Sequence, residues 1–268
     1  MYVDVHTHLT HEAFAADQSA VIERAILAGV SAIVVNGLDP VSNRQILAMA
    51  ERFSAVKPAL GIYPVDAVCG LLPTDFPLKV EVFDVDAEID FIASNAQAGR
   101  LAAIGECGLD GHWLTADTFA EQERVFGRLI DVAQTYDLPL IIHTRKLEQR
   151  AIDILRERRV KKVNFHCFGG RTKLAQVCAE SDGWYFSIPA NATVNEAFRK
   201  MLTTLPVERI LTETDAPYLP PRKGERNEPA NVVGTIDILA HQRGWSHEQA
   251  AKQVWSNYQD LFGKRWSL

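Results

Sequence analysis

The chain has 268 residues, of which 47% are hydrophobic and 23% are charged, and its formal net charge is −6. This is the composition of an ordinary soluble globular protein with ample apolar content for a large core. The acidic balance excludes a global positive field, so a nucleic acid would have to be met by local basic residues.

Strand-like and helix-like segments alternate along the whole chain. The expected strands are short, apolar and often β-branched, as strands buried on both faces are; they are Tyr2–His6, Ala32–Asn36, Val56–Ile62, Leu101–Gly105, Pro139–His143, Val163–Cys167, Trp184–Ile188 and Ile210–Thr214. The expected helices are amphipathic; they cover Ser19–Leu27, Asn43–Arg52, Asp86–Ala96, Thr118–Tyr136, Leu147–Arg158, Lys173–Ser181, Asn195–Leu205, Asn231–Gln242 and Gln249–Phe262.

Eight strands that are each followed by a helix predict a (β/α)8 TIM barrel, with residues 1–268 forming a single domain. A doubly wound open sheet is the alternative, but such a sheet gathers its chemistry at one switch point between two strands. The chemistry-bearing residues of this chain follow five different expected strands, which only a closed ring brings together.

Six residues with metal-binding side chains lie at or just after the ends of expected strands, where parallel barrels place their active sites; they are His6, His8, Glu106, His143, His166 and Asp215. His6 and His8 are two apart on a strand, so their imidazoles face the same side. This pair alone could equally be two hydrogen-bonded core histidines, and His143 or His166 alone is more often a core or hydrogen-bonded residue. The six together indicate a metal site.

Two acidic segments complete this pattern. Glu106 lies beside glycines after an apolar run, and a carboxylate buried there has to be paired or coordinated, although a capping or salt-bridging acid is the alternative. Asp215 precedes Ala216-Pro217, so a simple turn residue is its alternative. Glu213 lies two residues earlier on the same face, and we expect it either to orient a ligand or to form a structural salt bridge.

Other residues on the expected active face suggest substrate contacts. Tyr63, His112 and Trp113 could stack on exposed bases, which suits single-stranded ends. Arg145 follows the fifth expected strand and is the basic residue that we expect to contact substrate. Further cations on that face could form a basic rim, although ordinary solvated charges are the favoured interpretation for them; they are Lys146, Arg171, Arg222, Lys223 and Arg226.

The sequence resembles the TatD-type metal-dependent deoxyribonucleases, within the amidohydrolase-like barrel hydrolases. Motifs spread in order from residue 2 to residue 262 carry this resemblance; they are Asp4-Val-His-Thr-His8, Gly105-Glu-Cys-Gly-Leu-Asp110, Leu140-Ile-Ile-His-Thr-Arg145, His166-Cys-Phe-Gly-Gly170, Glu213-Thr-Asp-Ala-Pro-Tyr-Leu-Pro220, Arg226-Asn-Glu-Pro229 and Asn257-Tyr-Gln-Asp-Leu-Phe262.

The resemblance implies two divalent metal ions per chain, with Glu106 shared between them. His6, His8 and Asp215 would complete one site, and His143 and His166 the other. Zinc, manganese or magnesium are candidates, and magnesium suits so many nitrogen donors least. The chain departs from the family where Tyr63 replaces a histidine expected near the substrate phosphate, and where Gly111 displaces an aromatic residue.

The expected activity is that of a metal-dependent deoxyribonuclease, exonuclease-like, in which a metal-activated water cleaves phosphodiester bonds. Asp215 would act as general base as well as ligand, and Glu106 would bridge the ions. One alternative is hydrolysis of an ester or amide in a small molecule or in a D-aminoacyl-tRNA. Another is a non-catalytic binding or scaffold barrel, against which the retained ligands argue.

We expect the substrate to be a nucleic acid end, with single-stranded DNA favoured, and we find no sign of an obligate protein partner. The four cysteines form no Cys-x-x-Cys pair, which indicates reduced thiols. The chain shows no signal-peptide pattern at its start and no apolar run near the roughly 18 residues of a membrane span. These features predict a cytoplasmic protein.

Overall fold

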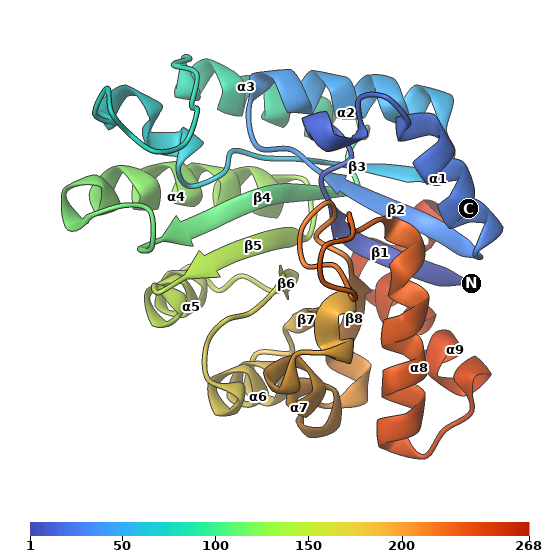
Figure 1. The fold of residues 1–268 in the computed structure, drawn as a ribbon. Coiled ribbons are helices and arrows are strands. Elements are labelled where there is room, and N and C mark those ends of the chain that lie inside the picture. The colour runs from blue at the N-terminus through green and yellow to red at the C-terminus, as the bar shows by residue number, and fades with distance from the viewer. Residues whose placement is uncertain (268) are drawn as a thin grey trace.

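Eight parallel strands run in sequence order around a barrel in the computed structural model, which describes residues 1–267 (Figure 1). The strands are β1 (Tyr2–Thr7), β2 (Val30–Asn36), β3 (Val56–Leu60), β4 (Ala103–Asp110), β5 (Leu140–Arg145), β6 (Val163–Phe165), β7 (Tyr185–Pro189) and β8 (Ile210–Glu213). The helices outside them are α1 (Gln18–Leu27), α2 (Pro40–Arg52), α3 (Val85–Gln97), α4 (Phe119–Thr135), α5 (Glu148–Glu157), α6 (Thr172–Ser181), α7 (Glu196–Thr204), α8 (Val232–Arg243) and α9 (His247–Phe262).

The ring is closed by contacts between the first and last strands. The backbone N–H of Asp215 donates to the carbonyl of His6, and that of His8 donates to the carbonyl of Ala216, each at 2.8 Å. Thr212 Oγ1 also donates to a β1 carbonyl, that of Val3, at 2.6 Å. The predicted (β/α)8 barrel is therefore confirmed, and the open doubly wound sheet is wrong.

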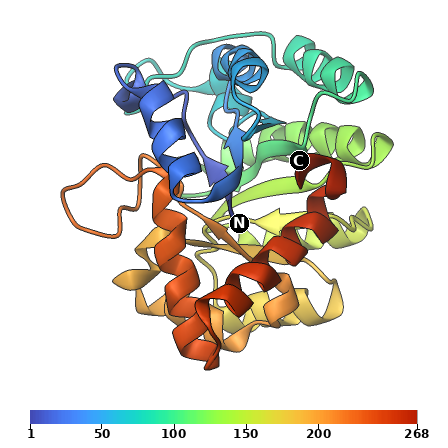
Figure 2. The same cartoon turned by 90° about the vertical axis from the view of Figure 1, so that its right-hand side faces the viewer.

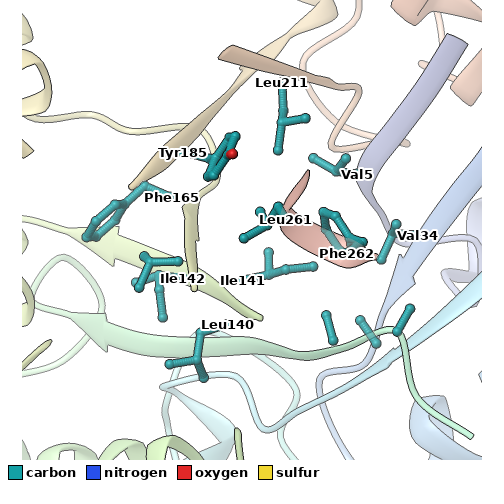
Figure 3. Packing of buried hydrophobic residues seen from close by; sticks show 14 of the residues in the cluster. Val5, Val34, Leu140, Ile141, Ile142, Phe165, Tyr185, Leu211, Leu261 and Phe262 are labelled. Carbon is teal, nitrogen blue, oxygen red and sulfur yellow. The ribbon is translucent and has the colours of Figure 1, made fainter. Parts of the chain in front are cut away.

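The core lies inside the barrel and between the strands and their helices, because strands covered on both faces bury nearly every side chain. In α4, Val125, Leu129 and Ala133 recur at helical spacing, and all three are buried. Leu261 and Phe262 at the end of α9 join the same core (Figure 3). This packing makes the barrel a rigid frame for residues at its carboxyl end.

Strand boundaries differ from the sequence expectation most clearly in β4. The expected strand ended at Gly105, whereas β4 continues to Asp110, so Glu106 lies within a strand rather than after it. Ladder pairing with β5 continues because the glycines let the two backbones approach closely; Gly108 lies opposite His143. The expectation that every candidate ligand lies at or beyond a strand end is thus wrong for Glu106, and also for His143, because β5 continues to Arg145.

Long connections follow β3 and β8 at the carboxyl end of the barrel. The loop after β8, drawn in orange, extends from that end in Figure 2. The connection after β3 includes the 3-10 helix η2 (Asp66–Leu71), and its Val65 and Val68 pack with Leu114 in a small apolar cluster. Within residues 1–267, no helix combines the length and the apolar character that crossing a bilayer requires. All four cysteines are free thiols.

Candidate metal centre

Three of the candidate ligands meet where β1 joins β8. His6 lies in β1 and His8 directly follows it, and their Nε2 atoms are 3.1 Å apart. Asp215 follows β8, and its Oδ1 atom lies 3.4 Å from each of these two nitrogens. The backbone bond between Asp215 and His6 that closes the barrel also holds this carboxylate beside the imidazoles.

The other three candidate ligands come from β4, β5 and the residue after β6. Glu106 Oε1 lies 2.9 Å from His143 Nδ1 and 3.0 Å from His166 Nε2. The two nitrogens are themselves 3.3 Å apart. His166 is held against β5 because its backbone N–H donates to the carbonyl of Ile142 at 3.2 Å.

Glu106 faces both groups at once. While its Oε1 faces His143 and His166, its Oε2 lies 3.4 Å from His6 Nε2 and 3.3 Å from His8 Nε2. The rings of His6 and His166 stack with centroids 3.7 Å apart, which joins the two halves. The structure therefore brings all six candidate ligands together in overlapping groups, and the buried Glu106 belongs to two of them, one with His6 and His8 and one with His143 and His166.

This donor set fits divalent cations better than it fits a closed network of hydrogen bonds. His6 Nε2 and His8 Nε2 face each other and also the same two carboxylates. A neutral imidazole has one N–H, which can be directed at only one acceptor at a time. Imidazole nitrogens and carboxylate oxygens are ligands of borderline cations such as zinc, so a cation accounts for the convergence.

Both carboxylates of the cluster are ionised, which is the form that binds a cation. Burial opposes ionisation of Glu106, but the charges of His166 and His6 hold the pKa of its carboxyl well below the ordinary value. Burial also opposes ionisation of Asp215, and hydrogen bonds with the β1 histidines lower the pKa of that carboxyl.

Glu213 lies behind the ligands and hydrogen bonds to neutral groups. Its Oε1 accepts from the backbone N–H of Cys167 at 2.8 Å, and its Oε2 accepts from Ser187 Oγ at 2.5 Å. Burial raises the pKa of this carboxyl well above its ordinary value. Because Cys167 follows His166 directly, Glu213 holds the backbone that carries a candidate ligand.

Asp110, at the end of β4, orients a candidate ligand, although the sequence motif containing it had suggested no such role. Its Oδ2 atom lies 3.0 Å from His143 Nε2, while the other ring nitrogen of that histidine faces Glu106. A carboxylate on the outer nitrogen fixes the tautomer and the orientation of a ligating imidazole. The spacing in the sequence could have revealed this role, because Asp110 lies four residues after Glu106 and therefore on the same face of an extended strand.

Asp4 supports the opposite side of the cluster in a similar way. Its Oδ1 accepts from the backbone N–H groups of His6, at 3.2 Å, and Thr214, at 3.0 Å. The buried carboxylate thus ties β1 to β8 beside Asp215. Its place two residues before His6 is the sequence signal that could have revealed it.

A cavity of about 390 Å³ opens over the ligand cluster. Tyr63 and Arg145, two of the residues expected to contact substrate, line it together with Trp113. Burial and the charges of Glu106 and Asp110 raise the pKa of the Tyr63 phenol, so the group keeps its proton and can donate a hydrogen bond.

The structure places two other predicted substrate-facing residues outside this cavity. Exposed His112 is not part of its lining, and the suggested substrate contact of this residue stays a prediction. Arg226 forms two hydrogen bonds with Asp17, at 2.8 and 2.7 Å, and lies over the ring of Phe14. Arg226 therefore has a structural role, which is neither the basic rim nor the ordinary solvated charge that the sequence suggested.

A parallel barrel that gathers histidines and carboxylates at the carboxyl ends of its strands has the architecture of the metal-dependent barrel hydrolases. Within that class the chain belongs to a particular family. Residues 3–263 match the TatD related DNase family, so the chain is a member of it.

Relatives of similar length support this assignment. The chain is 34% identical over 266 residues to human "Deoxyribonuclease TATDN3", covering 98% of this chain and 94% of the relative. It is 30% identical over 271 residues to "3'-5' ssDNA/RNA exonuclease TatD" of Citrobacter koseri, covering 97% and 98%. It is 31% identical over 268 residues to "Uncharacterized metal-dependent hydrolase YabD" of Bacillus subtilis, covering 98% and 99%.

Solved structures share the fold. The TatD homologue YJJV of Escherichia coli superposes with a TM-score of 0.83 at 24% identity, covering 97% of each chain. A TatD family hydrolase from Entamoeba histolytica gives a TM-score of 0.80 at 20% identity, covering 97% of each chain.

Proposed function

We propose that this protein is a metal-dependent deoxyribonuclease that hydrolyses phosphodiester bonds at nucleic acid ends. The observation that carries the proposal is the position of Glu106, one of whose carboxylate oxygens faces His143 and His166 while the other faces His6 and His8. Such a carboxylate can serve two cations at once, as two-metal hydrolytic sites require. The similarity to relatives named as a deoxyribonuclease and as a 3'-5' exonuclease supports the choice of substrate.

His6, His8, Glu106 and Asp215 would hold one cation, and Glu106, His143 and His166 the other. When bound, the cations would lower the pKa of a water molecule and neutralise charge that develops on the phosphate. Nitrogen-rich donors favour zinc or manganese over magnesium.

Asp215 would act as the general base. Its Oδ1 faces the imidazoles of His6 and His8, which leaves Oδ2 to accept the proton of the attacking water. The water oxygen would then form a bond to phosphorus, and the ester P–O bond on the opposite side would break. The departing oxygen would take up a proton from solvent to become a hydroxyl, and Asp215 would release to solvent the proton that it accepted. Because its pKa is lowered, the Asp215 carboxyl is unprotonated at neutral pH, so a carboxylate oxygen is present to take the proton.

Arg145 and Tyr63 would position the phosphate. Both line the cavity over the cluster, and Arg145 supplies a permanent positive charge there. The protonated phenol of Tyr63 can donate a hydrogen bond to a phosphoryl oxygen. A histidine at this position, as the family pattern has it, would donate the same bond. The limited volume of the cavity favours a strand end over an extended duplex.

End-labelled single-stranded DNA with added manganese or magnesium tests this function. We expect release of mononucleotides by the wild-type protein and a loss of at least about 100-fold for Asp215→Asn, since general-base catalysis contributes that much. Asp75→Asn, on an exposed segment, is the matched control and should retain full activity. Absence of metal-dependent cleavage, or equal cleavage by Asp215→Asn, would refute the proposal.

A further inference from the structure

A second cavity, of about 260 Å³, lies beside the one that covers the ligand cluster. The two cavities share three lining residues, His8, Leu38 and Tyr218. These residues form the wall between them, so a ligand that occupies both must pass over this wall. The second cavity therefore adjoins the candidate metal centre.

Tyr218 is the largest residue of the shared wall, and its position is coupled to the metal centre. Its backbone N–H donates to the carbonyl of Asp215 at 2.9 Å. The residue is 51% exposed, so it is open to a ligand. The ring meets His11 edge-on, with centroids 5.5 Å apart, and His8 at 6.4 Å.

His11 is also held in a defined orientation. It is the N-cap of the 3-10 helix η1 (Glu12–Phe14), and its Nδ1 accepts from the backbone N–H of Ala13 at 3.0 Å. This leaves the ring proton on Nε2, where it can be donated to a ligand. Two oriented aromatic rings thus border the second cavity.

The second cavity suits a neutral ligand better than an anion. Among its described lining residues there is no lysine or arginine, and the carboxylate of Asp39 is one of them. Asp39 already caps α2 by accepting from the backbone N–H of Ser42 at 2.7 Å, which satisfies the helix end that an anion would otherwise approach. Gln45 and Thr10 offer hydrogen-bonding groups at the rim, and Val41 offers apolar surface.

We propose that this second cavity is a nucleobase subsite. The scissile phosphate joins two nucleotides; the base of one lies in the first cavity, and Tyr218 and His11 bind the base of the other in the second cavity. The proposal rests on the phosphodiesterase function proposed above. The phosphate lies over the ligand cluster, and one base occupies each cavity on either side of the Tyr218 wall. A planar, neutral base with hydrogen-bonding edges matches the aromatic, polar and cation-free lining.

Three dinucleotides test this subsite on the metal-loaded protein. They are thymidylyl-thymidine and its two analogues in which one thymine is replaced by an abasic tetrahydrofuran. Stacking of one base corresponds to about 5- to 150-fold in affinity. We therefore expect loss of the base in the second cavity to raise the wild-type KM by about this factor.

Two variants locate that effect. Tyr218→Leu removes the ring, and His11→Asn removes the other ring while keeping a residue that can cap η1. In both variants the KM penalty at that one abasic position should shrink to about 2-fold or less. The penalty at the other position should persist in His11→Asn, because His11 lines only the second cavity.

His241→Asn, the same substitution on the exposed side of α8, is the control and should keep the wild-type pattern. An equal KM for all three wild-type reactions, or an undiminished penalty in both variants, would overturn the subsite. If no dinucleotide is cleaved, the phosphodiesterase function fails. In that case the Kd values of the three intact dinucleotides are measured by calorimetry for the wild type and the variants. A penalty in Kd for one abasic dinucleotide that shrinks in Tyr218→Leu and His11→Asn would support the subsite, and an unchanged penalty would overturn it.

Discussion

Gly61 and Glu106 approach so closely that no side chain fits between their backbones. A Cβ atom added at Gly61 would overlap the carbonyl oxygen of Glu106. Gly61 directly follows β3 and is held by Asn43, which donates to its carbonyl at 2.9 Å. The position of the shared carboxylate therefore depends on a glycine in a neighbouring strand connection.

Substitution of Gly61 by alanine should lower the stability of the protein. The backbone of Glu106 cannot yield as a flexible side chain does, so we expect Gly61→Ala to lower the free energy of unfolding by about 1–3 kcal/mol or more. Gly70→Ala is the matched control, because a Cβ at Gly70 meets nothing within 4 Å. Denaturant unfolding measures both, and equal stability of the two variants would contradict the argument.

Loss of the Asp110 carboxylate should weaken metal binding without removing a ligand. In Asp110→Asn, a neutral amide replaces the charged carboxylate that accepts a hydrogen bond from His143 Nε2. Removal of such a partner typically costs about 10- to 100-fold in metal affinity. Competition titration with a chromophoric chelator measures this affinity. Asp117→Asn, on a nearby exposed turn, should bind metal as the wild type does.

Metal content should distinguish the shared ligand from a ligand of one group. We expect Glu106→Gln to lose both ions, because each group of imidazoles faces one of its two oxygens. His143→Ala should retain one ion, since His6, His8 and Asp215 remain in place. Elemental analysis of the purified proteins gives the stoichiometry. Full metal content in Glu106→Gln would show that the carboxylate is not shared.

Asp66 should make stability depend on pH. Burial and the nearby charge of Asp39 raise the pKa of its carboxyl from 3.8 to about 8. Between about pH 4 and pH 8 the native state then holds a proton that the unfolded chain has lost, so unfolding becomes easier as the pH rises.

Asp66→Asn removes this dependence. Its Tm should exceed that of the wild type by more at pH 9 than at pH 5, as thermal unfolding at the two pH values would show. Asp75→Asn changes an exposed carboxylate in the connection after β3, which also contains Asp66. It should shift Tm by the same small amount at both pH values. A constant difference between Asp66→Asn and wild type at the two pH values would rule out the raised pKa.

The amino-acid sequence by itself determined the barrel and the identity of the clustered residues. Strand periodicity and turn residues are local properties, so alternating apolar runs and helices could be recognised without coordinates. The histidines follow such runs, and the topology of a parallel barrel then places them at one end.

Only the tertiary structure decided how those residues share their contacts. The continuation of β4 beyond Gly105 depends on its pairing with β5, and this pairing sets Glu106 between the two imidazole groups. The ion pair of Arg226 with Asp17 joins segments 209 residues apart. Contacts of this kind depend on strand register and barrel closure, which are long-range properties that no local pattern encodes.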